Sequence, residues 1–199
     1  MGFQFFNLRH HAAICGAALT LVLTASVPAT ANEPAPTQAQ AQYEVRFMTD
    51  MIDHHHMAIM MSQICLTNAT HEELKAMCAD IIAAQQQEIA TMQTWLQDWY
   101  GISYAPEMTQ GDMQRMERMS EMFGAEFEIA FMKSMIRHHW KAVVRASGCL
   151  DRAYHAELIA MCEDIVIAQV SEIETMRTWL CQWYGICNYG PKGNVAETH

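Results

Sequence analysis

The fold of this chain is decided by a stretch that occurs twice. Residues 47–56 read FMTDMIDHHH, and residues 131–140 read FMKSMIRHHW. The similarity continues outward without a gap, because residues 47–102 align with residues 131–186 at a constant offset of 84, with 31 of 56 positions identical. Chance does not produce such a match, so the chain contains one unit in two copies.

Each copy is predicted to form an antiparallel pair of helices. In copy one the first helix is expected from about Tyr43 to Cys65, because no Pro or Gly interrupts that run. Thr70 and Glu73 have the spacing of a capping box, which predicts the start of the second helix. This helix is expected to end at Gly101, since glycine commonly follows a helix C-terminus.

Copy two repeats this pattern, with its turn near residues 148–154 and its last helix ending at Gly185. Residues 103–130 link the copies and are expected to contain a short helix from Met108 to Phe123, ended by Gly124. Four long helices in two antiparallel hairpins predict an all-α four-helix bundle with a long helical linker.

The two ends of the chain are predicted to lie outside this bundle. Residues 1–31 have a short basic start, an uncharged run and small residues before a cleavage point after Ala31, which is the pattern of a signal peptide. The alternative is an uncleaved membrane anchor, although the run is marginal for a span. A single domain is predicted over residues 43–187, and the polar tails 32–42 and 188–199 are expected to be disordered. The mature protein is therefore expected in the periplasm or outside the cell.

Composition narrows the function. Removal of residues 1–31 takes away one basic residue, so the formal net charge changes from −10 to about −11 on a mature chain of about 168 residues. An acidic chain with scattered bases is a poor partner for nucleic acid. Methionine accounts for 17 of 199 residues. It is both a flexible core filler and a soft ligand suited to Cu(I), and composition alone does not separate the two roles.

The mature chain keeps six cysteines, an even number that is typical of an exported protein with disulfides. Two flank the first turn, two flank the second turn with the same spacing, and two lie near the end of the last helix. The simplest pairing gives each hairpin one disulfide near its turn. The predicted bridges are Cys65–Cys78, Cys149–Cys162 and Cys181–Cys187.

These bridges predict which residues of a hairpin lie level with one another. Levels run in opposite directions along antiparallel helices, so His55 lies level with Glu88, and Met51 with Met92. Residues four apart share a helix face, so these side chains form one patch. The matching patch in copy two is His139, Glu172, Met135 and Met176. Such an N, O and S set is a candidate metal site; the alternative is that the histidines only hydrogen-bond within a partly buried interface.

The same residues resemble a known family. The patterns in residues 47–61, 85–92 and 124–143 are similar to the domain-of-unknown-function 305 (DUF305) family, over most of residues 43–186. The resemblance implies a ferritin-like four-helix bundle that is usually exported, and a link to copper binding. It carries over the positions His54, His55, Met61, Gln85, Glu88 and Met92, then His138, His139, Gln169, Glu172 and Met176. Arg145 stands where the family's methionine is expected in copy two.

Further methionines lie outside that pattern. Four in the linker are spaced three residues apart, which places their sulfurs along one stripe of the expected short helix. The stripe either packs against the bundle or collects Cu(I). The candidate accessory thioethers are Met57, Met60, Met113, Met116, Met119 and Met122. His71 and His155 recur at the first turn of their helices and are interpreted as surface or capping residues.

The two copies differ in the turn of helix after the His pair. The change removes one imidazole and three thioethers and adds two cations, which repel a bound metal ion. Copy one is therefore expected to hold the main copper site. The replaced residues are His56, Met57, Met60 and Met61, and their replacements are Trp140, Lys141, Val144 and Arg145.

Two functions remain open from sequence. The first is a non-enzymatic protein of the cell envelope that binds copper, as Cu(I) or Cu(II), and sequesters it or passes it on. The second is a structural or protein-interaction bundle without metal, whose His pairs organise the core. No catalytic constellation is evident, and a di-iron oxidase is disfavoured because the Glu-x-x-His motif of such sites does not occur in the sequence.

Overall fold

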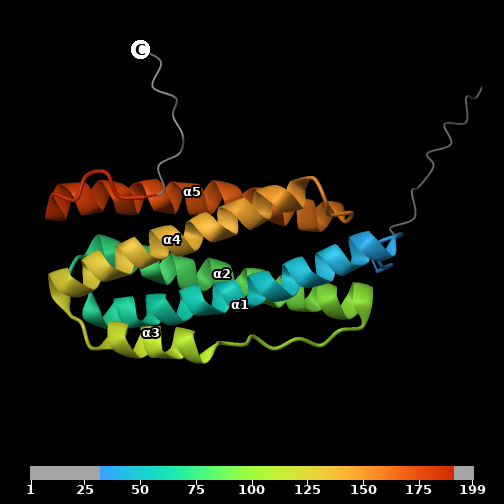
Figure 1. Cartoon of the computed structure of the whole chain (residues 1–199), viewed down its shortest axis with the longest axis horizontal. Helices are drawn as coiled ribbons and strands as arrows, with labels where there is room; N and C mark the ends of the chain where they lie inside the picture. The colour runs from blue at the N-terminus through green and yellow to red at the C-terminus, as the bar shows by residue number, and fades with distance from the viewer. Residues whose placement is uncertain (1–31, 191–199) are drawn as a thin grey trace, which may run out of the picture.

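The computed structural model describes residues 32–190, which form five α-helices and, within that range, no β-strand. The helices are α1 (Gln38–Asn68), α2 (Glu72–Tyr100), α3 (Gln110–Ser120), α4 (Gly124–Leu150) and α5 (Ala156–Tyr184) (Figure 1). The predicted all-α fold of two helical hairpins with a helical linker is confirmed. The expected signal peptide, its cleavage after Ala31 and residues 191–199 of the expected tail lie outside the described residues.

The second helix of each hairpin ends at the glycine expected from the sequence. Gly101 and Gly185 follow α2 and α5 with φ of 65° and 68°, the left-handed region that side chains with a Cβ rarely adopt. Their N–H groups donate to carbonyls of the preceding turn, which satisfies groups that a helix end leaves unpaired.

The predicted capping box at the start of α2 is wrong. The N-cap is His71, one residue later than expected, and its side chain makes no capping bond to the helix. The Thr70 hydroxyl donates instead to Glu128 of α4, which also accepts the backbone N–H groups of Thr70 and His71. A carboxylate from the other hairpin has therefore replaced the local cap.

Helix α1 begins earlier than predicted, so the expected disordered tail 32–42 is also corrected. Residues 38–42 are helical, and the Thr37 hydroxyl caps them by accepting from the Gln40 N–H. Their Gln and Ala residues look like a polar linker in composition, but both have high helix propensity. At the other end, residues 188–190 are described, and Tyr189 donates to the Lys133 carbonyl at 3.2 Å rather than being disordered.

The linker is held against α1 before it becomes helical. Asp53 accepts bonds from the Tyr104 hydroxyl and the Glu107 N–H, both at 2.8 Å. A capping box between Thr109 and Asp112 then starts α3. Gly124 does not end this helix as predicted; α3 ends at Ser120, and Gly124, with φ of 57°, begins α4.

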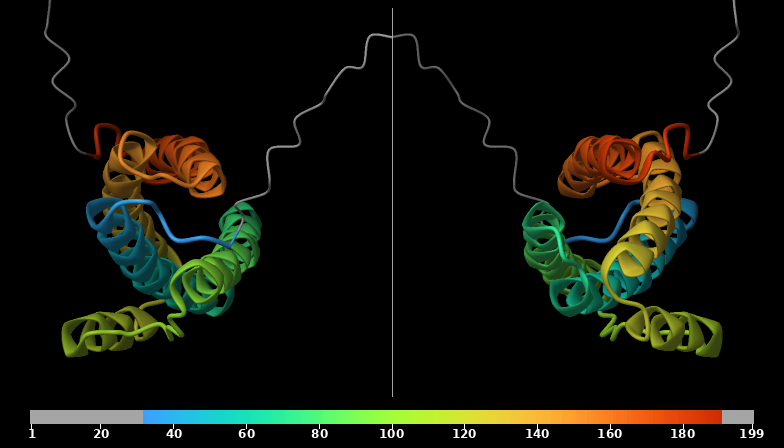
Figure 2. Two further views of the ribbon diagram at one scale, coloured as in Figure 1. Left: turned by 90° about the vertical axis from the view of Figure 1, so that its right-hand side faces the viewer. Right: turned by 90° about the vertical axis from the view of Figure 1, so that its left-hand side faces the viewer.

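The hairpins meet through their first helices. Helix α1 packs on α2, and α4 packs on α5, while contact between the hairpins runs mainly through α1 and α4 (Figure 1). The end-on views show α2 and α5 flanking this central pair, with α3 on the outside beside α1 (Figure 2). No helix in the described part of the chain is both long enough and apolar enough to cross a membrane.

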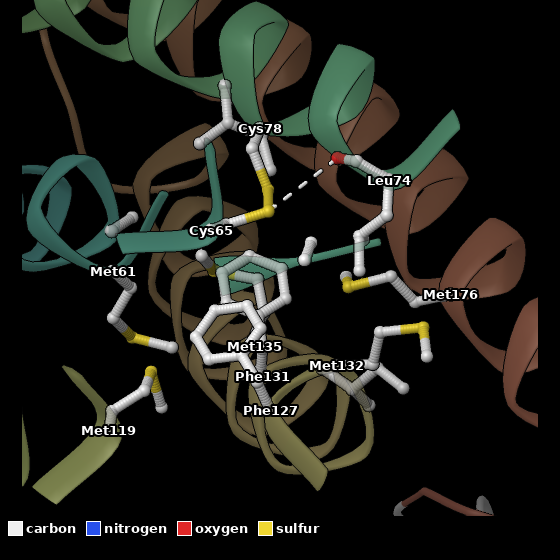
Figure 3. Packing of buried hydrophobic residues seen from close by; sticks show 14 of the residues in the cluster. Met61, Cys65, Leu74, Cys78, Met119, Phe127, Phe131, Met132, Met135 and Met176 are labelled. Atoms are coloured by element: carbon white, nitrogen blue, oxygen red, sulfur yellow. Dashed lines mark hydrogen bonds between the residues drawn. A yellow bond between two sulfur atoms is a disulfide. The ribbon is translucent and has the colours of Figure 1, made fainter. Parts of the chain in front are cut away.

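The core is divided into two clusters, and each combines the turn end of one hairpin with the open end of the other. In the first cluster, the Cys65–Cys78 end of hairpin one packs against Phe127 and Phe131 of α4 (Figure 3). In the second, the Cys149–Cys162 end of hairpin two packs against Phe47 and neighbouring residues. The two hairpins therefore lie in opposite directions. All three predicted disulfides, Cys65–Cys78, Cys149–Cys162 and Cys181–Cys187, are confirmed.

Candidate metal centre

The register that the cysteines predicted brings each His pair level with a glutamate. Nε2 of His55 lies 2.7 Å from Oε2 of Glu88, and Nε2 of His139 lies 2.6 Å from Oε2 of Glu172. Both histidines are fully buried, whereas the glutamate side chains keep about a fifth of their surface exposed. Each pair therefore joins the two helices of its own hairpin.

The first histidine of each pair has a different neighbour, which the sequence did not predict. The rings of His54 and His138 stack with centroids 3.6 Å apart and an interplanar angle of 26°. This contact lies where α1 and α4 pack together, between the two core clusters. The two copies thus contribute equivalent histidines to one place.

None of these four histidines forms a hydrogen bond through its ring. Both ring nitrogens of His54, His55, His138 and His139 are buried without a hydrogen-bond partner in the described structure. Nε2 of His55 and Nε2 of His139 nevertheless have a carboxylate beside them, that of Glu88 and that of Glu172. Buried polar atoms in folded proteins are nearly always satisfied, so the other six ring nitrogens, gathered in one region, are candidates to bind a further group.

The stacked histidines are held in the neutral form. Burial, followed by the charges of His55 and Arg145, lowers the pKa of His54 to about 2. Burial and the neighbouring His54 lower the pKa of His138 well below its usual value. Neutral imidazole is the form that binds metal ions, so protons compete little with a metal here.

A cleft of about 730 Å³ opens onto the stacked histidines between α1, the linker and α4. From α1 it is lined by Met57 and Met61, and from α4 by Lys141 and Arg145. The repeat places each of these cations at the position of one of the methionines. The difference between the copies therefore lies between two walls of one cleft, and a main copper site in copy one stays a prediction.

Most of the remaining predicted ligands are buried, but not all of them. Met51 and Met92 are fully buried in one cluster, and Met135 and Met176 are fully buried in the other. The side-chain oxygens of Gln85 and Gln169 are buried without a hydrogen bond. Met60 packs at the edge of the first cluster, Met113 is exposed, and Met116, Met119 and Met122 pack α3 against α1 and α4.

Acidic side chains line the cleft but do not converge on one point: they are Asp50 and Asp53 of α1, Glu107 of the linker and Asp112 of α3. Over residues 32–190, no three residues among His, Cys, Asp and Glu converge in a way that could hold a metal ion. Glu88 and Glu172 each contact one histidine only. A metal ion held here would need imidazole together with thioether ligands.

A second pair of polar clusters, which the sequence did not predict, clamps the hairpins together. Glu44 of α1 is fully buried and accepts from the Tyr154 and His155 N–H groups, at 2.6 and 2.9 Å. Its other oxygen lies 2.6 Å from Nδ1 of His155 and accepts from the Tyr100 hydroxyl at 2.5 Å. His155 also stacks on Trp99, at 3.7 Å between centroids. The glutamate of one hairpin thus holds the turn of the other.

The equivalent clamp lies 84 residues away and runs in the opposite direction. Glu128 of α4 accepts from the Tyr184 hydroxyl and lies 2.6 Å from Nδ1 of His71, which stacks on Trp183. Burial alone raises the pKa of Glu128, but the bonds from Tyr184 and from the backbone of His71 and Thr70 lower it to about 2. His71 and His155 do occupy N-cap positions, but their side chains bind the other hairpin. The sequence did contain one sign of these clamps: Glu44 recurs as Glu128 at the offset of the repeat, just outside the aligned unit 47–102.

Together, these features define a class of all-α protein with two antiparallel hairpins around a buried histidine and methionine site. A family model named domain of unknown function (DUF305) matches residues 44–180, and the chain belongs to this family. The match runs through both hairpins as one segment, so it does not divide the chain into two copies of the family domain.

Several solved structures resemble this chain in fold. CopM in its Cu(I)-bound form is 31% identical, with a TM-score of 0.65 over 71% of this chain and 98% of CopM. CopM in its Cu(II)-bound form is likewise 31% identical, with a TM-score of 0.64 over 71% of this chain and 97% of CopM. A DUF305 protein from Streptomyces coelicolor is 26% identical, with a TM-score of 0.62 over 70% of this chain and 91% of that protein. No curated protein matches the chain.

Proposed function

We propose that this chain is a non-enzymatic copper-binding protein that acts outside the cytoplasm and holds copper through its buried histidines and methionines. The observation that carries this proposal is the set of six imidazole nitrogens, both of His54 and of His138 and Nδ1 of His55 and of His139, that are buried with no hydrogen bond or ion pair. A core whose only task was structural would satisfy these atoms or replace them with apolar side chains, because a buried unsatisfied polar group destabilises the fold.

The donor atoms favour copper over harder metals. Imidazole nitrogen and thioether sulfur suit copper, whereas iron and manganese oxidase sites need several carboxylates. Met57 and Met61 share the cleft with His54 and His138, so both donor types are available there. The family supports the same choice, since the relative CopM, at 31% identity, has structures in Cu(I)-bound and Cu(II)-bound forms.

Export is proposed on two grounds. The three disulfides require an oxidising compartment to form and persist. The sequence of residues 1–31 has the pattern of a signal peptide, with cleavage after Ala31. We place the mature protein in the periplasm or outside the cell, where sequestering copper or passing it on needs no catalytic step.

A metal titration of the mature, disulfide-bonded protein tests this function. We expect stoichiometric uptake of Cu(I) or Cu(II) and no stoichiometric uptake of Fe(II). The double variant His54→Ala/His138→Ala is expected to lose copper, whereas His56→Ala, a partly exposed neighbour, is expected to keep it. Uptake of Fe(II) with no response to either copper ion would overturn the proposal in favour of an iron-binding protein, and uptake of none of these ions would favour a bundle in which the histidines are structural.

A further inference from the structure

All the apolar residues of α3 other than its glycine are methionines. The helix reads QGDMQRMERMS, and Met122 follows just after it. Met116 and Met119 are buried, each 7% exposed, whereas Met113 is 53% exposed. Packing of this stripe against the bundle is therefore part of its role, but packing alone does not explain the choice of residue. A buried Met loses more side-chain entropy than a buried Leu, and Leu has equal helix propensity.

Three methionines of the linker, of which Met116 and Met119 are buried and Met122 is partly buried, meet two methionines of α1. Met116, Met119 and Met122 share a cavity of about 170 Å³ with Met57 and Met61. Figure 3 shows the side chains of Met61 and Met119 pointing toward one another across the space between α1 and α3. Five thioethers from two elements far apart in sequence thus line one small cavity.

The rest of the lining contains no competing ligand. It includes neither an imidazole nor a carboxylate, and its charged residues are Arg115 and Arg118. Arg115 is paired with Asp112, which offsets part of its charge. Neutral sulfur donors suit soft monovalent ions, and nearby guanidinium groups repel a divalent ion about twice as strongly as a monovalent one.

We infer that Met57, Met61, Met116, Met119 and Met122 form a second metal site, made only of thioethers, that takes a monovalent soft cation such as Cu(I) or Ag(I). The site goes beyond the proposed histidine centre and does not need it in order to bind. Met57 and Met61 line both the thioether cavity and the histidine cleft, so the two sites adjoin.

Titration with Ag(I), Cu(I) and Cu(II) tests the site. The triple variant Met116→Leu/Met119→Leu/Met122→Leu keeps the size and helix propensity of α3. We expect it to bind one equivalent less of Ag(I) and Cu(I) than the unmodified protein, with Cu(II) stoichiometry unchanged. Met113→Leu, on the exposed face of the same helix, is the matched control and is expected to keep every equivalent.

Two further measurements separate this site from the histidine centre. In His54→Ala/His138→Ala, we expect an Ag(I) equivalent to remain, with only sulfur around the metal by X-ray absorption. In the unmodified protein, Ag(I) is expected to shift the methyl NMR signals of Met116, Met119 and Met122 but not that of Met113, a readout that no variant's folding affects. Unshifted signals, or a triple variant that keeps all its Ag(I), would overturn the thioether site while leaving the histidine proposal standing.

Discussion

The imidazole ring of His54 lies 3.6 Å from that of His138, centroid to centroid, although 84 residues separate them. The stack joins equivalent positions of the two hairpins, at the place where α1 and α4 pack together. The duplicated motif thus gives one central His–His contact and two outlying His–Glu pairs, and a metal ion bound at the centre, as we propose, would be shared between the hairpins.

If His54 and His138 hold the same metal ion, they should act as a unit in copper binding. We expect His54→Ala and His138→Ala to cause similar losses of copper affinity, and the double variant to lose little more than either single one, because residues that share one site are not additive. Copper titrations of the three variants, with thermal melting to check folding, measure this. Additive losses would show that the histidines serve separate sites.

The difference between the walls of the cleft gives a second prediction. Arg145 occupies the position equivalent to Met61 and faces the same cleft. Arg145→Met removes a cation and adds a thioether. Since a unit charge at 4 Å is worth about 1 kcal/mol even in water, affinity for Cu(I) is expected to rise about fivefold or more. Lys75→Met, at an ion pair on α2, is the control for a general charge effect.

A third prediction concerns acid stability. The pKa of Glu128 is lowered to about 2 in the folded protein, so the stability that it contributes is fully present above its ordinary pKa of 4.5 and is lost as the pH falls toward 2. Glu128→Gln should lower the free energy of unfolding at pH 7 by about 2 kcal/mol, because a buried acceptor of several hydrogen bonds loses its charge. The free energy of unfolding of this variant should also change less between pH 4.5 and 2 than that of the unmodified protein.

Denaturant unfolding at several pH values checks this prediction. Glu126→Gln, two residues away on the exposed side of α4, is the matched control and should unfold like the unmodified protein. Glu44→Gln should lose stability in the same way as Glu128→Gln. Burial raises the pKa of Glu44, but the hydrogen bonds from Tyr100 and His155 outweigh this effect, so the pKa is lowered overall. If Glu128→Gln is as stable as Glu126→Gln at pH 7, the clamps do not hold the hairpins together.

Contacts within a hairpin could be predicted from the sequence, whereas contacts between the two hairpins could not. Helical period and the repeated cysteines fixed the register, so the contact between His55 and Glu88 followed from spacing alone. The stack of His54 on His138 depends on how α1 crosses α4, and no periodicity encodes that crossing. His71 was misinterpreted for the same reason, because its partner Glu128 belongs to the other hairpin.

The thioether cavity was only half predicted. The stripe of methionines on the linker was visible from their spacing, and the sequence left open whether it packs or binds metal. Where the stripe docks depends on the anchoring of the linker by Asp53 to Tyr104 and Glu107. That tertiary contact places the stripe beside Met57 and Met61.

The last prediction concerns the disulfides, whose loops differ in length. Cys65–Cys78 and Cys149–Cys162 each span a sequence separation of 13, and Cys181–Cys187 spans only 6. The chain-entropy model gives about 3 kcal/mol for each longer loop and about 2 kcal/mol for the shorter one. Replacing either longer pair by alanine should therefore lower the melting temperature by about 6–12 °C, and replacing the shorter pair by less.

Thermal melting of the three double-alanine variants under oxidising conditions measures these differences, and peptide mapping without reductant confirms the pairs. The variants that lack a hairpin disulfide should also bind copper more weakly than the variant that lacks Cys181–Cys187. Each hairpin bridge holds the register that sets a histidine level with its glutamate, whereas Cys181–Cys187 only ties the end of α5 to the segment that follows it. Equal copper affinity in all three variants would show that packing of the hairpins alone maintains the register of the metal ligands.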